Sequence, residues 1–249
     1  MALSQPSVLE GATLQQFVQY VLDRHEQSST LVFCGSREAF FEQLTQSAAH
    51  KPEESHSGGQ NSELPANPEP SHTAPIVQHT WAVPTLRLLL TSRTMKVAFC
   101  PDITHLRAYL ATYNQPADNQ EIAGAQSHDT RILAIANLIH LHRPTSAFSA
   151  QGLNRTYAGA VEAAFRSHSK LVTAECVEAA STATKDTDPD GEMLDVAHPR
   201  TSSVWDEEVS ILNVTTKSFG AGERGWVGRT VKLRTIAARW CVFGSAGSA

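Results

Sequence analysis

The chain has 249 residues, of which 41% are hydrophobic, and a formal net charge of −5 at pH 7. This length predicts one substantial core, and the acidic balance excludes general electrostatic attraction to nucleic acid, so any such binding needs a local basic patch. The first residues do not form a secretory signal, and no window approaches about eighteen consecutive apolar residues, so we expect an intracellular protein without a membrane-spanning helix.

In the first half of the chain, apolar patterns predict helices that alternate with strands. Thr13 and Gln16 fit a capping box at the start of the first helix. Pro, Ser, Glu, His and Gly dominate residues 47–80, which we expect to be a disordered insertion. The expected elements are helices at Thr13–Glu26, at Arg37–Gln46 and after Pro101-Asp102, strands at Thr30–Cys34 and Met95–Cys100, and a helix or short strand at Leu86–Leu90.

The second half continues the alternation. Arg131–Leu141 is apolar on both faces, which is typical of a central strand in a covered parallel sheet. Ser149 is a candidate N-cap for a helix whose apolar stripe includes Tyr157 and Phe165, and a second disordered insertion is expected at residues 178–203. The remaining elements are expected to be strands at Leu171–Ala174 and Val209–Val214, and a C-terminal β-hairpin made of Thr230–Leu233 and Trp240–Phe243.

This alternation predicts an α/β fold with a mainly parallel central sheet flanked by helices, in a single domain that spans residues 1–249. The four cysteines are far apart and form no CxxC pair, so we expect them to be free thiols, mostly in the core.

One segment also carries a family resemblance. Phe148–Glu175, FSAQGLNRTYAGAVEAAFRSHSKLVTAE, resembles the part of RecA/Rad-type recombinase cores that links the Walker B strand to the next strand of the sheet. Leu31–Leu44 looks like the second strand and helix of such a core, and Arg131–Leu141 looks like its Walker B strand. Thr173-Ala-Glu175 stands where recombinases often carry a Thr-Asn-Gln sensor. The resemblance implies a RecA-like, P-loop NTPase-like fold.

The residues that hold nucleotide in that family are absent here. The Walker A position reads Gly11, Ala12, Thr13, with alanine in place of the lysine and without the upstream glycine and strand. The Walker B position has Ala136 or Asn137 in place of the magnesium-binding aspartate. Because both charge-compensating groups are missing, the resemblance implies a degenerate nucleotide site, no ATP hydrolysis, no catalytic residue and no cofactor.

The C-terminal part holds a basic cluster with interleaved tryptophans, Trp226 and Trp240. Such a pattern can hold a nucleic-acid backbone and stack bases, although a solvated hairpin face would have the same composition. The nucleic-acid-binding candidates are Lys217, Arg224, Arg229, Lys232, Arg234 and Arg239.

Two other motifs give weaker signals. Gly220–Gly225 matches GxGxxG but precedes a basic strand rather than a helix, so a glycine-rich loop is the favoured interpretation. His105, His140 and His142 lack Cys or acidic partners at useful spacing, so no metal is expected.

The resemblance favours a non-catalytic accessory subunit in homologous recombination and DNA repair, similar to the Shu-type proteins. Such a subunit would pair with another RecA-like chain, with single-stranded DNA as a further partner and a nuclear location. One alternative is a RecA-like accessory subunit of an Elongator-type tRNA-modification complex, for which a cytoplasmic location would be expected. A second is a small nucleotide-binding enzyme with a phosphate site at Gly11–Thr13 or Gly220–Gly225.

Overall fold

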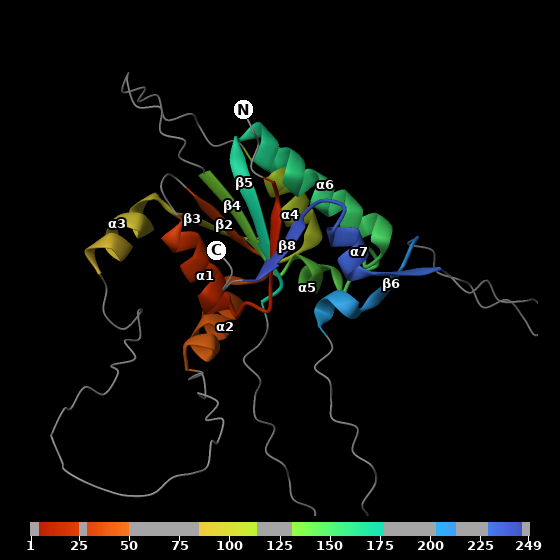
Figure 1. The fold of residues 1–249 in the computed structure, drawn as a ribbon, viewed down its shortest axis with the longest axis horizontal. Coiled ribbons are helices and arrows are strands. Elements are labelled where there is room, and N and C mark those ends of the chain that lie inside the picture. Colours follow the sequence, from red (N-terminus) through yellow and green to blue (C-terminus); the bar gives the residue numbers. More distant parts are fainter. Residues whose placement is uncertain are drawn as a thin grey trace, which may run out of the picture.

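A computed structural model describes residues 5–24, 29–49, 85–113, 131–176, 203–212 and 229–245. These residues form helices packed on a central sheet (Figure 1). The elements in chain order are β1 (Ser7–Glu10), α1 (Leu14–Asp23), β2 (Thr30–Phe33), α2 (Arg37–Ala49), α3 (Leu86–Thr94), β3 (Lys96–Phe99), α4 (Ile103–Thr112), β4 (Arg131–Ala136), α5 (Leu138–His142), α6 (Ala150–Arg166), β5 (Ser169–Ala174), the 3-10 turn η1 (Val204–Asp206), β6 (Glu208–Ser210), β7 (Thr230–Lys232), α7 (Leu233–Ala237) and β8 (Val242–Ser245).

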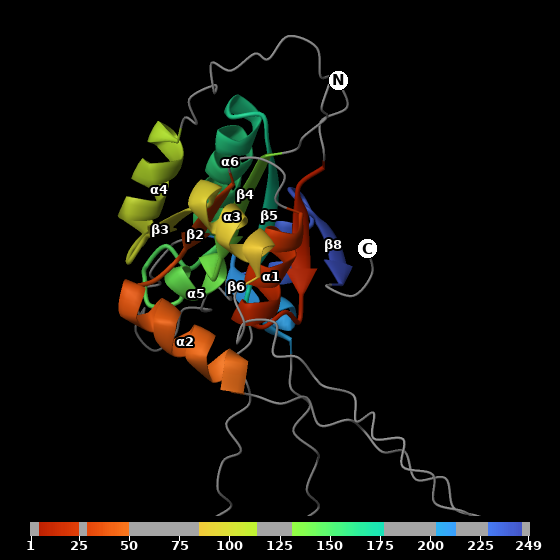
Figure 2. The same ribbon diagram turned by 90° about the vertical axis from the view of Figure 1, so that its left-hand side faces the viewer.

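The central sheet has six strands in the order β3-β2-β4-β5-β1-β8, and every neighbouring pair is parallel. The short strands β6 and β7 pair antiparallel in a separate two-stranded sheet. The prediction of an α/β fold with a mainly parallel sheet is therefore confirmed. In Figure 2 the outer strands β1 and β8 lie side by side at one edge of the sheet.

Helices cover both faces of the sheet, and each face has its own apolar core. On β4, Leu133 and Ile135 point into the core made with α4, α6 and α7, whereas Ile132 and Ala134 point into the core made with α1 and α2. All four side chains are buried, as expected for a central parallel strand.

Side-chain caps fix the starts of three helices, as the sequence predicts. Thr13 and Gln16 form the reciprocal bonds of a capping box on α1. Asp102 accepts from the amide of His105 on α4, and Ser149 accepts from the amide of Gly152 on α6. Each cap satisfies a helix amide that has no partner within the helix, which sets where the helix begins.

The structure differs from the prediction at two strands and at one side chain. The strand predicted at Arg131–Leu141 ends at Ala136, because Asn137 takes a left-handed conformation (φ 64°) and the apolar run continues as α5. Phe165 is exposed instead of facing the core. The strand predicted at Val209–Val214 is only β6, and Asn213 and Val214 lie outside the described residues.

The predicted C-terminal β-hairpin is wrong. Its first strand, β7, pairs with β6, and residues Leu233–Ala237 form helix α7. Its second strand, β8, pairs parallel with β1, and the amide of Val242 bonds to the carbonyl of Pro6. The first strand that the Walker A comparison expects to be missing is therefore present as β1. β8 thus extends the main sheet, whereas β7 belongs to the separate two-stranded sheet.

Most of both predicted insertions lies outside the described residues. Helix α2 continues through Ala49, so residues 47–49 are helical, and Ser203 is the N-cap of η1, so the second segment is structured at its last residue. Of the cysteines, Cys34, Cys100 and Cys241 are buried free thiols, and Cys176 is partly buried. In the part of the chain that the structure describes, no helix has the length and apolar character to cross a bilayer.

Candidate functional site

A cleft of about 600 Å³ lies at the carboxyl ends of β2, β4 and β5. Cys34 follows β2, Asn137 follows β4, and Glu175 and Cys176 follow β5, so adjacent parallel strands deliver them to one edge of the sheet. Helix α2 contributes Gln43 to the wall. Ligands of open parallel α/β sheets bind at this edge, outside the carboxyl ends of the strands.

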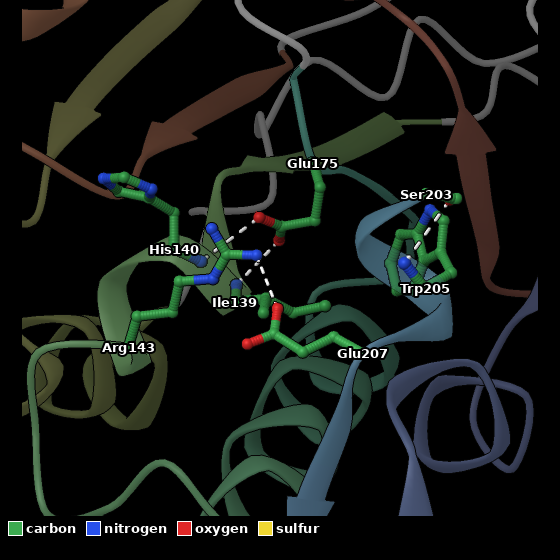
Figure 3. A network of polar contacts seen from close by, with 7 residues as sticks. All are labelled: Ile139, His140, Arg143, Glu175, Ser203, Trp205 and Glu207. Atoms are coloured by element: carbon green, nitrogen blue, oxygen red, sulfur yellow. Dashed lines mark hydrogen bonds and ion pairs between the residues drawn. The ribbon is translucent and has the colours of Figure 1, made fainter. Parts of the chain in front are cut away.

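Glu175 is the buried acid of this cleft, with 9% of its surface exposed. One carboxylate oxygen accepts from the amide of Ile139 at 2.7 Å and the other from the amide of His140 at 3.2 Å (Figure 3). Both donors belong to the first turn of α5. The carboxylate therefore caps a helix that carries no side-chain cap of its own.

Burial raises the pKa of Glu175 to about 7, and the two amide bonds together with the charge of Arg143 only partly oppose this rise. A carboxyl with such a pKa exchanges its proton near neutral pH. Burial also holds the pKa of the adjacent Cys34 thiol well above its usual range. Cys34 is therefore a neutral thiol rather than an activated nucleophile.

Asn137, at the Walker B position, has a structural role in this cleft. Its side-chain nitrogen donates to Gln43 at 2.9 Å, and its side-chain oxygen accepts from the amide of Cys176 at 2.9 Å. Gln43 in turn donates to the carbonyl of Cys176 at 3.3 Å. Ala136 is fully buried at the end of β4. These bonds tie α2 to the ends of β4 and β5.

Arg143 closes one side of the cleft. Its guanidinium donates to Glu207 at 2.6 Å and lies between Glu207 and Glu175 (Figure 3). Both partners of the pair are partly exposed, so the pair contributes only about 0–1 kcal/mol to stability. Its effect on the cleft is to place one positive charge near the buried carboxylate.

The Walker A position forms a tight turn between β1 and α1. Gly11 has a positive φ of 65°, Ala12 is fully buried, and Thr13 caps the helix. Because Thr13 accepts from the amide of Gln16, one of the first free amides of α1 is already occupied. The three-residue connection is also shorter than the glycine-rich loop that surrounds a phosphate in P-loop proteins.

The C-terminal cations proposed to bind nucleic acid differ in their surroundings. Lys232 pairs with Asp206 at 3.5 Å, and Arg234 pairs with Glu10 and covers the ring of Phe243. Arg229 and Arg239 are exposed, and Lys217, Arg224 and the glycines of Gly220–Gly225 lie outside the described residues. Trp240 is partly buried, and its indole donates to Asn154 on α6 at 2.9 Å, so it is committed to packing.

The three histidines considered as metal ligands have different surroundings in the structure. His142 is buried and bonds to the carbonyl of Ala147 and the hydroxyl of Thr156, and burial lowers its pKa to about 4. His105 pairs with Asp102, and His140 lines the cleft. Among the described residues, no three His, Cys, Asp or Glu side chains are grouped as metal ligands.

Sequence reasoning missed the contribution of Gln43 and Arg143, and it assigned Glu175 only to a sensor position. The available signal was the place of Glu175 immediately after a buried strand, where an ionisable side chain reaches the carboxyl edge of the sheet. Comparison with family models, curated proteins and solved structures found no match to this chain.

Proposed function

We propose that the chain is a non-catalytic RecA-like accessory subunit of homologous recombination and DNA repair, which acts by assembling with another RecA-like subunit. The parallel sheet with helices on both faces is compatible with a RecA-type core. The segment Phe148–Glu175 contains α6 and β5 and follows β4 and α5, and β4 and β5 are neighbours in the sheet, which supports the comparison with the segment after the Walker B strand.

The state of the two nucleotide positions supports a role without ATP hydrolysis. Ala12 offers no charge to a phosphate and is buried under α1. Asn137 offers an amide in place of a carboxylate, and both ends of that amide bond to protein groups. The strand, turn and helix of the Walker A position are therefore present, and the polar groups at the two nucleotide positions form contacts within the protein.

The observation that carries the assembly role is an apolar edge made by Leu86, Leu89 and Leu90 of α3 and Val97 of β3. Leu86 is 86% exposed and Leu90 is 69% exposed. Within the described residues, β3 pairs only with β2, and no described strand pairs with its outer edge. Apolar side chains beside an open strand edge are typical of a surface that binds a partner.

Affinity purification of the full chain from its own cells tests this proposal. The wild type should retain a RecA-like recombination subunit, and the double variant Leu89→Glu, Leu90→Glu should lose it. Phe41→Glu is the matched control, because Phe41 is a comparably exposed apolar side chain on α2, and it should retain the partner. Recovery of Elongator subunits, or equal recovery with the α3 variant, would contradict the proposal.

A further inference from the structure

Helices α4 and α6 pack on the side of the sheet away from α1 and α2 (Figure 1), and residues of both helices line a second concave surface. This groove has a volume of about 380 Å³ and is lined by three arginines, Arg107 from α4 and Arg155 and Arg166 from α6. Glu162 is the carboxylate among its lining residues. The groove thus has a net positive charge on a chain whose overall charge is −5.

Arg107 is held in place by its neighbours on α6. Its Nε donates to the hydroxyl of Thr156 at 3.1 Å, and one terminal nitrogen donates to the carbonyl of Gly152 at 3.0 Å. Burial and the nearby charge of Arg155 lower the pKa of Arg107. Within the described residues neither arginine forms an ion pair with a carboxylate. Two like charges without a counterion in a concave site favour an anionic ligand.

Arg166 extends the positive surface toward the end of α4. Its guanidinium donates to the carbonyls of Leu110 and Ala111 at 2.9 and 3.1 Å. Glu162 lies 3.9 Å away and is largely exposed, so it neutralises little of this charge. The fixed hydrogen bonds of Arg107 and Arg166 reduce the side-chain entropy that a ligand would otherwise have to overcome.

The spacing of the charges indicates the kind of anion. Arg155 and Arg166 are separated by three turns of one helix, or about 16 Å along its axis, so one phosphate group cannot contact both. A strand with repeated phosphates can. Phe165, next to Arg166 in the sequence but outside the lining of the groove, is 60% exposed, and an exposed aromatic ring offers a stacking surface for an unpaired base.

We propose that the groove between α4 and α6 binds the phosphodiester backbone of a single-stranded nucleic acid, with Arg155 and Arg107 contacting one phosphate and Arg166 another. The inference goes beyond the proposed assembly role, because it adds a nucleic-acid ligand to the protein partner. It places the contact on the helical face of the molecule instead of on the C-terminal cations, of which Lys232 and Arg234 already have carboxylate partners.

Fluorescence anisotropy with the full chain and a labelled oligothymidylate tests the inference. Arg155→Ala should weaken binding about 10-fold at low salt and reduce the slope of log K against log salt by about 0.7, the value for one phosphate of a single strand. Glu162→Gln should tighten binding, because it removes the adverse charge. Arg37→Ala, on α2 across the sheet, is the control and should bind as the wild type does.

Each other outcome overturns the inference. If Arg155→Ala binds as tightly as wild type, or if only a combined Lys232→Ala, Arg234→Ala variant loses binding, the groove is not the site. A wild type that binds an acidic phosphopeptide but not the oligonucleotide identifies a different ligand. If the wild type binds no oligonucleotide, the groove is not a nucleic-acid-binding site. The assembly role is tested separately by the purification with the α3 variant.

Discussion

Replacing Glu175 with glutamine should make the stability of the protein depend steeply on pH between pH 4 and pH 7. The pKa of this carboxyl is about 7 in the folded chain and 4.5 in its ordinary state. Between these values the folded chain binds a proton that the unfolded chain has released. The free energy of unfolding that this group contributes is therefore complete below pH 4.5 and falls by about 3 kcal/mol as the pH rises to 7.

His142 has the opposite effect in nearly the same interval. Its pKa is about 4 in the folded chain and 6.5 in its ordinary state, so here the unfolded chain binds the additional proton. Stability from this group is present above pH 6.5 and is lost, again by about 3 kcal/mol, as the pH falls to 4. In the wild type the two contributions nearly cancel. In Glu175→Gln only that of His142 remains, and stability should rise steeply from pH 4 to pH 7.

Urea unfolding at several pH values between 4 and 8, followed by the fluorescence of the buried Trp205, measures this difference. The quantity to compare is the wild-type free energy of unfolding minus that of the variant, because the other titrating groups cancel in it. Glu162→Gln is the control, since Glu162 is exposed. If the difference stays constant across this range, Glu175 titrates as an exposed acid and its burial as the cap of α5 is refuted.

Three further sets of variants test other parts of the fold. Gly152→Ala should destabilise the protein by about 1–3 kcal/mol or more, because the new Cβ would lie 2.0 Å from the carbonyl oxygen of Ala147. Gly159→Ala should stabilise α6 by about 0.5–1 kcal/mol, because a Cβ at this position would meet no atom within 4 Å. Urea unfolding measures both changes. Thr13→Ala should lower stability by about 1 kcal/mol by removing the cap of α1, a loss that Thr13→Ser should largely restore in thermal unfolding. In His142→Gln the contribution of Glu175 is no longer offset by that of His142. The free energy of unfolding of this variant should therefore fall as the pH rises from 4 to 7 in the same series of urea unfolding measurements.

Local signals in the sequence were sufficient for the starts of α1, α4 and α6 and for the α/β fold class. Thr13, Asp102 and Ser149 cap helices through residues only three positions away, so the information lies within one turn. The end of β4 could not be read in this way. Residues on both sides of Asn137 are apolar and buried, and hydrophobicity does not distinguish a buried strand from a buried helix.

The strand pairing and the candidate site depend on contacts across the chain. β1 and β8 acquire their neighbours from opposite ends of the sequence, which no local pattern encodes. Glu175 follows an apolar strand and reads as a surface acid, because its burial is decided by α5 and by the neighbouring end of β4. The arginines of the groove between α4 and α6 come from two helices, so their proximity depends on how those helices pack.

The position of β1 affects how the molecule can fold. This strand lies between β5 and β8, and Ser7 is paired with Val172 on one side and Val242 on the other. A nascent chain therefore produces β1 before the other described strands but must be extended through β8 (Val242–Ser245) before both edges of β1 are paired. We expect β2, β4 and β5 to form an early folding nucleus, with β1 and β8 joining it late because closing the longest loop is slowest. Until β8 arrives, β1 is the open edge at which newly made chains would aggregate.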